Sequence, residues 1–300
     1  MTGRIVCVGN GVLDQVYEVG AMPRVGVKTT ALGFRESGGG PAATAAVAIA
    51  ALGGAASWWG RVGDDSAGAA LRAAMTRHGV DLSGLAVVPG GRTVRAAVIV
   101  EPSGERSIIV DRSGLPSDAA LLPEDDLADV AVLLADTRWP PGAEAALRRA
   151  RDRGITRVLD ADGGDAGVLE RLTALADHVV FSQEGLTDFV GASEIEAQLR
   201  RAAARIAGVV AVTCGAAGSL WWIDDRILPV AAFPVMPRDT TGCGDVFHGA
   251  YALGLAEAMP PLEAARFASA TAAAKAERGM GWDGMPGRAA VDRMIMKEKT

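Results

Sequence analysis

Short apolar runs alternate along this chain with stretches of helical spacing. The apolar runs occupy residues 4–9, 55–60, 130–136, 157–162, 178–182 and 209–215. Uninterrupted apolar runs of this length are typical of strands that are buried on both faces of a parallel sheet. The segments with helical spacing include residues 41–52, 66–78, 143–153 and 194–206. This rhythm predicts an α/β fold with a mostly parallel central sheet, helices on both faces and ligands outside the carboxyl ends of the strands.

A second group of β-like segments lies outside this rhythm. It comprises residues 16–19, 29–35, 94–100 and 106–110, the last two joined by the turn sequence EPSGE. Such segments are expected to pair into a small sheet. The chain has no internal repeat and no low-complexity linker. We therefore expect a single domain over residues 1–300, with a β lid built from segments at about residues 15–37 and 92–112.

The composition narrows the class of protein. A chain of 300 residues, 49% of them hydrophobic, can bury a large core. Its formal net charge of −6 argues against nucleic acid as the main partner. The start MTGRIVCVGN has no basic segment before a long apolar run, and no window reaches the roughly 18 apolar residues of a membrane span. Three cysteines do not suit a disulfide framework, so we expect a cytoplasmic protein.

The sequence GNGVLD at residues 9–14 invites comparison with a dinucleotide-binding fingerprint. That fingerprint needs a third small residue where this chain has Asp14, and a helix after it. The following QVYEV alternates like a strand, so the dinucleotide interpretation is weak. Asp14 would lie at the end of the first strand, where it is either an acceptor for substrate hydroxyls or a turn-forming residue.

A glycine run, Gly38–Gly40, precedes Pro41 and a segment of helical spacing. Glycine and proline before a helix are ordinary N-terminal punctuation. Three glycines also allow a ligand to approach the backbone closely. The pattern alone leaves both interpretations open.

The stretch DTTGCGDVF at residues 239–247 carries the most specific signal. Gly242, Cys243 and Gly244 can present successive backbone N–H groups at the positive end of the following helix, which is a natural anion hole. Asp245 would lie in the first turn of that helix, beside any bound phosphate. This is the arrangement that phosphoryl transfer to an alcohol needs, because the donors stabilise the transferred group and the carboxylate deprotonates the nucleophile. A glycine turn capped by aspartate would not explain the second acidic residue, Asp239.

Taken together, these motifs resemble those of the ribokinase-like (PfkB) carbohydrate kinases. The similarity extends over nearly the whole chain, through GNGVLD, the glycine run, GRVGDDSAG, VTCGAAG and DTTGCGDVFHGA. The resemblance implies a three-layer sandwich with a small β lid. It also implies an enzyme that transfers phosphate from ATP to a sugar hydroxyl with Mg²⁺.

The resemblance also assigns residues to roles. Asp245 would be the catalytic base and the backbone of Gly242, Cys243 and Gly244 the anion hole. The implied sugar contacts are Asp14, Gly39 and Gly40, the implied nucleotide contacts are Thr213, Gly215 and Gly218, and the implied ligands of a monovalent cation such as K⁺ are Asp239 and Thr241.

Two positions depart from the family pattern. Relatives usually carry a sugar-binding Asn shortly after the glycine pair, whereas this chain has Ala42-Ala43-Thr44, so we do not expect ribose as the substrate. Many relatives also carry Asn-x-x-Glu, linked to magnesium and phosphate, where this chain has Ser182-Gln183-Glu184-Gly185. Ser182 and Glu184 are then the candidates for that role.

Within the family, SGGGPAATAAVA, GRVGDD, LLADTRW and VLDAD are similar to the sulfofructose kinase subgroup. That resemblance makes Lys28 and Arg138 the candidates that bind a sulfonate, for which Arg and Lys are suited. The alternative is that Lys28 is a solvated lid residue and Arg138 a surface ion-pair member. Asp111 stands where the subgroup has a neutral Asn, so either the adjacent Arg112 takes over or the substrate is a neutral ketose.

The leading hypothesis is therefore an ATP- and Mg²⁺-dependent ketose kinase that converts 6-deoxy-6-sulfofructose to its 1-phosphate. The alternatives are a kinase for a neutral ketose or nucleoside, or a catalytically silent sugar-binding protein on the same fold. The expected partners are a small sugar and a second copy of the chain that pairs through the lid, with neither nucleic acid nor membrane.

Overall fold

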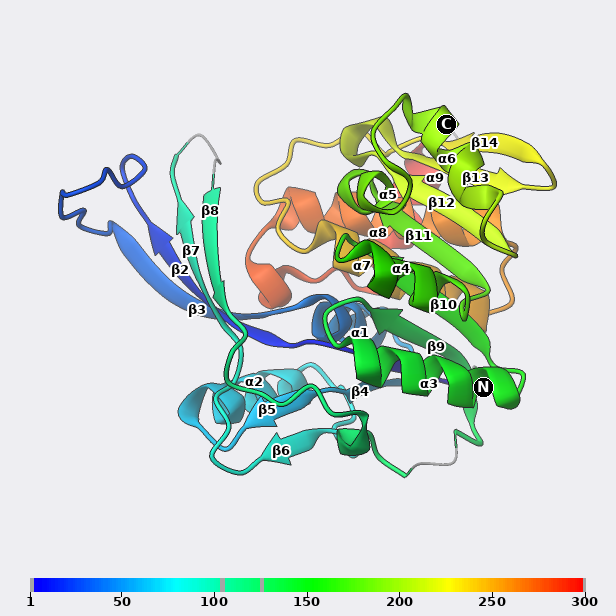
Figure 1. Cartoon of the computed structure of the whole chain (residues 1–300). Coiled ribbons are helices and arrows are strands. Elements are labelled where there is room, and N and C mark those ends of the chain that lie inside the picture. Colours follow the sequence, from blue (N-terminus) through cyan, green and yellow to red (C-terminus); the bar gives the residue numbers. More distant parts are fainter. Residues whose placement is uncertain (1–2, 103–105, 125–126, 299–300) are drawn as a thin grey trace.

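The computed structural model describes residues 3–102, 106–124 and 127–298. Its main feature is an eight-stranded sheet in the order β14-β13-β12-β11-β10-β9-β1-β4 (Figure 1). The strands are β1 (Arg4–Val8), β4 (Ala56–Trp59), β9 (Val130–Asp136), β10 (Thr156–Ala161), β11 (His178–Ser182), β12 (Val209–Thr213), β13 (Ser219–Ile223) and β14 (Arg226–Val230). Neighbours from β4 to β12 pair in parallel, and β13 and β14 add an antiparallel edge. The prediction of a mostly parallel sheet is confirmed.

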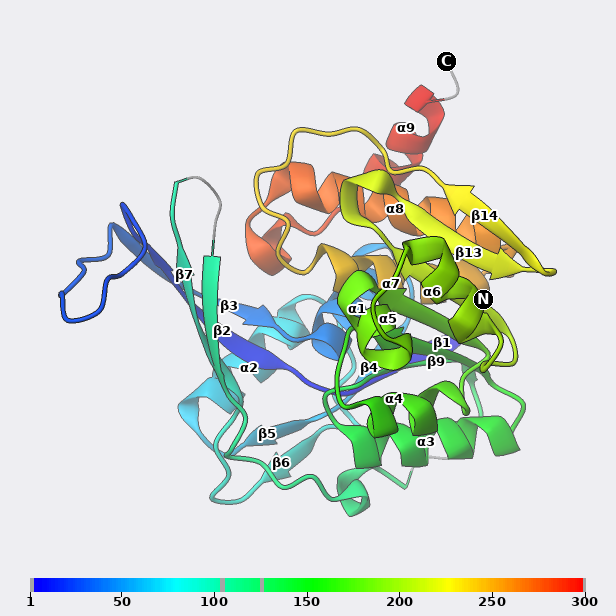
Figure 2. The same cartoon turned by 45° about the horizontal axis from the view of Figure 1, so that its top comes forward.

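Helices cover both faces of this sheet, as predicted (Figure 2). One apolar cluster joins the sheet to α1 (Pro41–Ala51), α2 (Ser66–Arg77), α7 (Cys243–Ala256), α8 (Pro261–Arg278) and α9 (Arg288–Glu298). The other joins it to α3 (Pro140–Asp152), α4 (Ala166–Thr173), α5 (Gln183–Val190) and α6 (Ile195–Ala203). Alternate residues of β1 enter alternate clusters, Ile5 and Cys7 the first and Val6 and Val8 the second. The apolar run is unbroken because both of its faces are buried.

A second sheet projects from the body of the molecule (Figure 1). Its order is β3-β2-β7-β8, formed by β2 (Val12–Glu18), β3 (Gly33–Gly39), β7 (Arg95–Val100) and β8 (Arg106–Asp111). These strands fall mainly in the two ranges expected for a lid, and we call this sheet the lid sheet. Its buried apolar cluster contains only Val16, Ala96 and Val98. A small parallel pair, β5 (Arg61–Gly63) and β6 (Ala86–Val88), lies below it.

The lid strands differ from the prediction at their boundaries. The strand expected at residues 29–35 begins only at Gly33 and continues to Gly39, and that expected at residues 16–19 covers Val12–Glu18. One interpretation of Gly38 and Gly39 is that they precede a helix start, but they belong to β3 and pair with Leu13 and Val12 of β2. Residues 103–105 of the predicted hairpin turn lie outside the described part of the chain.

The GNG sequence has a packing role in this fold. A side chain at Gly9 would collide with the carboxyl of Asp136, and one at Gly11 with the ring of Trp58. Strand β2 follows Gly11, where a dinucleotide fingerprint would require a helix. The structure therefore does not support the dinucleotide interpretation, which the sequence already made weak.

Across the described ranges, no helix combines the length and apolarity needed to span a membrane.

Candidate functional site

A cavity of about 760 Å³ lies between the lid sheet and the body of the molecule. Its walls come from the lid strands, from the segment that leads into α7 and from the end of α8. It brings together seven of the residues that the sequence proposed: Asp14, Gly39, Gly40, Asp239, Thr241, Gly242 and Asp245. The structure thus gathers the expected sugar contacts, anion hole and base around one space, although they are separated by some 200 residues in the sequence.

The turn before α7 is held in an unusual backbone conformation. Gly242 caps the helix with a φ of 73°, in the left-handed region that glycine adopts without strain. The Asp239 carboxylate accepts a hydrogen bond from the backbone N–H of Thr241 at 2.8 Å. Gly242 lines the cavity, so the N-terminus of α7 lies at its wall, where the positive end of the helix favours an anion. The backbone N–H of Cys243 donates a hydrogen bond to the carbonyl oxygen of Thr240 at 3.2 Å.

Helix α1 begins at the same cavity. Gly249 of α7 lies so close to Ala45 of α1 that a side chain there would collide with the α1 backbone. Gly40 caps α1 with a φ of 91°, and a Cβ there would lie 2.7 Å from the carbonyl oxygen of Asn10. Two helix N-termini therefore converge on one space and reinforce its preference for negative charge.

Asp245 lies in the first turn of α7 and remains partly exposed to the cavity. Loss of hydration and the nearby carboxylate of Asp160 raise the pKa of Asp245 well above its ordinary value, although His248 opposes the shift. A carboxylate with a raised pKa is a stronger base. Its position and pKa both fit the removal of a proton from a hydroxyl.

Asp14 lies on β2 opposite Ser37 of β3, at the floor of the cavity. Its carboxylate covers Gly39, where any side chain would collide with it. Burial raises the pKa of Asp14 to about 6, while the charge of Arg35 acts in the other direction. The glycine is therefore needed so that the carboxylate can lie against the backbone and face the cavity.

The segment Ala42-Ala43-Thr44, which replaces the family's sugar-binding Asn, is buried in the first turns of α1. Thr44 accepts a hydrogen bond from the indole N–H of Trp282 at 3.0 Å. Trp282 also packs against Gly38, where a side chain would collide with the indole ring. A tryptophan from the C-terminal part of the chain thus forms this wall of the cavity.

Sequence reasoning missed a carboxylate that builds the site, Asp136 at the end of β9. Its Oδ2 accepts hydrogen bonds from the backbone N–H groups of Asn10 at 2.8 Å and Ala42 at 3.1 Å. Its Oδ1 accepts one from the backbone N–H of Arg138 at 2.8 Å. Burial raises the pKa of Asp136, although these three hydrogen bonds act to lower it. Asp136 therefore joins the ends of β1 and β9 to the start of α1. The polar residue that ends the apolar run was its only sequence signal.

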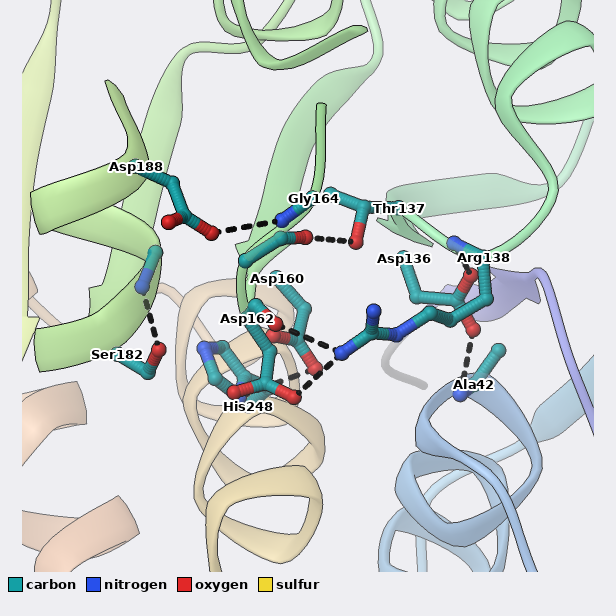
Figure 3. A network of polar contacts seen from close by, with 12 residues as sticks. Ala42, Asp136, Thr137, Arg138, Asp160, Asp162, Gly164, Ser182, Asp188 and His248 are labelled. Atoms are coloured by element: carbon teal, nitrogen blue, oxygen red, sulfur yellow. Dashed lines mark hydrogen bonds and ion pairs between the residues drawn. The ribbon is translucent and has the colours of Figure 1, made fainter. Parts of the chain in front are cut away.

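His248 of α7 lies beside Asp160 in the polar network of Figure 3. His248 is buried, with Nδ1 2.8 Å from the carbonyl oxygen of Gly244 and Nε2 3.2 Å from that of Val180. Its Nδ1 also lies 3.3 Å from Oδ2 of Asp160. His248 therefore ties the first turn of α7 to the central sheet.

The residues proposed for a sulfonate lie in three places. Arg138 donates hydrogen bonds from Nη2 to the backbone oxygen and the carboxylate of Asp162, at 2.7 and 3.0 Å (Figure 3). Burial lowers the pKa of Arg112, and the charge of Arg138 acts in the same direction while that of Asp136 opposes it. Asp111 is exposed and accepts hydrogen bonds from the N–H and hydroxyl of Ser113. Lys28 lies on the exposed connection between β2 and β3.

The residues proposed for the nucleotide lie at the carboxyl ends of β11 and β12. Ser182 caps α5 by accepting a hydrogen bond from Gly185 N–H at 2.9 Å. A side chain at Gly185 would collide with the carbonyl oxygen of Ala161, so a glutamate does not fit there, and the neighbouring Glu184 is exposed. Of the remaining three, Thr213 ends β12, Gly215 begins the 3₁₀ turn Gly215–Ala217 that follows, and Gly218 caps that turn.

Comparison with known proteins identifies the family. Residues 2–286 match the pfkB family carbohydrate kinase model. A fructokinase from Klebsiella pneumoniae is 31% identical over 238 residues, which are 73% of this chain and 76% of that protein. A protein from Agrobacterium tumefaciens, provisionally assigned as a ribokinase, is 32% identical with a TM-score of 0.92 over 100% of both chains.

The fold is shared more widely. The ribokinase of Arabidopsis thaliana, solved with ribose and ATP, has a TM-score of 0.88 over 98% of this chain and 99% of that one, at 24% identity. The predicted ribokinase-like fold is confirmed, as is the prediction of a phosphotransferase that acts on sugars. This chain belongs to the pfkB family of carbohydrate kinases.

Proposed function

We propose that this protein transfers the γ-phosphoryl group of ATP to a hydroxyl group of a ketose. The observation that carries the proposal is the position of Asp245. It lies in the first turn of α7, beside the N–H groups of the glycine turn, and it lines the same cavity as Asp14. A silent sugar-binding protein would need neither the base nor the anion hole.

The residues divide the reaction between them. Asp14 accepts hydrogen bonds from sugar hydroxyls, and Asp245 takes the proton of the reacting hydroxyl as its oxygen attacks the γ-phosphorus. The bond between the γ-phosphorus and the bridging oxygen breaks, and ADP leaves. The N–H groups of residues 242–244 stabilise the negative charge on the transferred group.

The donor types near Asp245 suit the Mg²⁺ that accompanies ATP. In the described part of the chain, no group of three or more His, Cys, Asp and Glu side chains is placed to hold a metal. Mg²⁺ needs only one or two carboxylates when phosphate oxygens and water complete its shell. Asp162 is half exposed, and the buried Oδ1 of Asp160 has no hydrogen-bond partner. We assign these two as the residues that would hold Mg²⁺, which would neutralise phosphate charge.

We further propose that the sugar carries an anionic group, with 6-deoxy-6-sulfofructose as the best candidate and its 1-hydroxyl as the acceptor. The positive charges of Arg112 and Arg138 support this, because they act unfavourably on one another, and a bound anion would offset that repulsion beyond what the Asp136 carboxylate supplies. The Asp111 carboxylate is bonded to Ser113, next to the charges of Arg92 and Arg95. The carboxylate stays ionised, and the positive charges of Arg92 and Arg95 partly offset its repulsion of a sulfonate.

A neutral ketose is the second candidate. The ion pair between Arg138 and Asp162 already satisfies part of one guanidinium, as it would in a site that binds no anion. The fructokinase relative from Klebsiella pneumoniae also favours this candidate.

An ATP-consumption screen separates these candidates. Sulfofructose, fructose 6-phosphate, fructose, ribose and a nucleoside would be compared at matched concentrations, with Asp245→Asn as the blank for contaminating kinases. Turnover of the anionic ketoses far above fructose would support the anion site. Preference for fructose would establish the neutral-ketose kinase, and no turnover of any sugar would contradict the proposed function.

We also propose that the lid sheet pairs with a second copy of the chain. Its edge strand β8 is exposed along its length, and Ile108 and Ile109 on it expose 48% and 68% of their surface. Phe34 on the other edge strand, β3, exposes 56%. Exposed apolar strands associate readily. We expect a dimer in analytical ultracentrifugation that Ile109→Ser weakens; a monomeric wild-type protein at high concentration would contradict this.

Location in the cytoplasm stays a prediction. The cysteines are free thiols, as expected for a reducing compartment. Burial raises the pKa of Cys243 to about 11, so the thiol in the anion hole is not a nucleophile at neutral pH.

A further inference from the structure

A buried lysine lies beneath the catalytic turn. Lys275 belongs to the last turns of α8, and only 1% of its surface is exposed. Lysine is almost never buried to this degree unless its ammonium group has partners. Its Nζ lies 3.5 Å from the carbonyl oxygen of Thr241, and the side chain also reaches the wall of the cavity. No local sequence pattern singles out this residue.

The charge of Lys275 also acts on the carboxylate of Asp239. Burial acts to raise the pKa of Asp239, but the hydrogen bonds from Thr241 and the charges of Lys275 and Arg35 outweigh it, so the pKa is lowered. The carbonyl oxygen of Ala276, next to Lys275, accepts hydrogen bonds from the N–H groups of Arg238 at 2.8 Å and Asp239 at 3.3 Å. Helix α8 is therefore tied to the turn on either side of the ammonium group.

Other charged groups face the same turn. Arg106 of β8 donates a hydrogen bond from Nη1 to the hydroxyl of Thr241 at 3.0 Å, and Arg35 acts on Asp239 from β3. Asp245 follows in the first turn of α7. Lys275 is the cation that approaches the Thr241 carbonyl oxygen from the interior of the protein.

Asp239 and Thr241 are the two residues that the family resemblance assigned to a monovalent cation. Their oxygens are suitable ligand types for K⁺. However, the ammonium group of Lys275 lies against the same carbonyl oxygen and acts on the same carboxylate. A second positive charge there would repel the ammonium in surroundings that screen charge poorly. The residues present therefore do not fit a bound K⁺.

We propose that the Lys275 ammonium group takes the place of the monovalent cation. Lys275 is then a positioning residue, which holds the Asp239–Thr241 segment so that the N–H groups of residues 242–244 point at the transferred phosphate. The enzyme consequently needs no K⁺. This inference rests on the proposed function for its kinetic test, but not for its binding test.

The wild-type protein supplies the first test. Activity and thermal unfolding would be measured in K⁺ and in tetramethylammonium, which is too large for the turn, at equal ionic strength. We expect rates that agree within about twofold and the same unfolding temperature, because no cation binds. Activation by K⁺ of about tenfold, or a K⁺-specific rise in the unfolding temperature, would overturn the proposal.

Lys275→Ala supplies the second test, because Ala removes the charge and leaves room for a cation. In tetramethylammonium we expect a loss of kcat of about tenfold or more, the scale of a charge-assisted hydrogen bond, and K⁺ should restore most of it. A structural lysine would give a loss that K⁺ does not restore, and that result would overturn the proposal, as would a variant with unchanged kcat. Lys297→Ala, on the exposed face of α9, is the matched control.

A third readout does not depend on activity. Crystals of the wild-type protein and of Lys275→Ala would be soaked in Rb⁺, whose anomalous signal locates the ion. We expect a peak beside the Thr241 carbonyl oxygen in the variant alone; a wild-type peak there would overturn the proposal. Since this test needs no substrate, failure to find a phosphorylated sugar would count against the proposed function only. The wild-type measurements also decide the question if the variant does not fold.

Discussion

The central sheet and the lid sheet are built on opposite principles. All residues of β4 and all but one of β9 are buried, and two apolar clusters hold helices against the two faces of the central sheet. Every residue of β8 is exposed, and the lid sheet buries a cluster of only three side chains. A sheet with so little buried apolar surface is marginally stable by itself.

This difference separates two tasks. The proposed base and anion hole start from α7, whose next residues are buried against the central sheet, so their geometry is held by the core. Asp14 and the glycines beside it belong to the lid sheet, which binding of a substrate can stabilise. Changes at the α7 turn should therefore alter turnover on every sugar. Changes at the residues proposed to contact the sugar, in the lid sheet or at Arg138 after β9, should alter which sugar is bound.

The largest expected effect comes from the body. Asp245→Asn should lower kcat on the order of a hundredfold or more for every accepted sugar, because a positioned base supplies that much. ATP binding, measured by calorimetry, should hardly change, since the backbone N–H groups remain. Turnover near the wild-type value would remove Asp245 from the role of base.

Arg138→Ala should weaken kcat/KM by roughly tenfold to a hundredfold for an anionic ketose, because a hydrogen bond to a charged group is lost. The loss should be much smaller for fructose, which has no anion to bind. Arg148→Ala, an exposed arginine of the neighbouring helix α3 that pairs with Glu144, is the control. Equal losses on both sugars would favour the neutral-ketose kinase.

The pH dependence tests the junction between the two regions. Asp14 must be ionised to accept hydrogen bonds from a hydroxyl, and its pKa of about 6 places that ionisation close to neutrality. We expect kcat/KM for the sugar to fall about tenfold per pH unit below this value. Asp245, whose pKa is also raised, adds to the fall. A profile that stays flat to about pH 5 would contradict the role of Asp14.

The same shift makes a prediction for stability. Because the folded-state pKa of Asp14 lies above its ordinary value of 3.8, the folded protein favours the protonated carboxyl, and stability is lost as pH rises from about 4 through about 6. Asp14→Asn should therefore raise the free energy of unfolding at pH 7 by about 1–2 kcal/mol, after allowance for partial exposure.

Asp111→Asn is the matched control for this measurement. The pKa of Asp111 is lowered, chiefly by hydrogen bonds from Ser113, so its removal should have the opposite sign. A loss of stability from Asp14→Asn would contradict the raised pKa of Asp14, and a gain from Asp111→Asn would contradict the lowered pKa of Asp111. Urea unfolding curves at two pH values give both free energies.

The smallest effect concerns the motion of the lid sheet. Backbone hydrogen exchange in β3, β7 and β8 should slow when substrate and a non-hydrolysable ATP analogue are bound, because both sides of the cavity are then held together. The hydrogen bond from Arg106 to Thr241 is a contact that such closure can use. Unchanged exchange in these strands, with protection confined to the central sheet, would show that the lid sheet does not close.

The sequence by itself determined the parallel sheet, its helical covers and the catalytic turn. Unbroken apolar runs predict strands that are buried on both faces, and glycines followed by aspartate at a helix start have few other uses, so both signals are local. Lid boundaries were harder to predict. The strand at Gly33–Gly39 contains no β-branched residue. Larger residues at Gly38 and Gly39 would collide with Trp282 and Asp14, which are distant in the sequence, so the local sequence does not explain these glycines.

Only the tertiary structure decided what surrounds the turn. Asp136, His248 and Lys275 lie on three different elements, and each looks in the sequence like an ordinary member of an apolar segment. Their importance comes from burial and from partners far along the chain, such as Asn10 for Asp136 and Thr241 for Lys275. A buried charge requires a partner wherever the fold brings one, and that pairing depends on distance in space, which local sequence patterns do not contain.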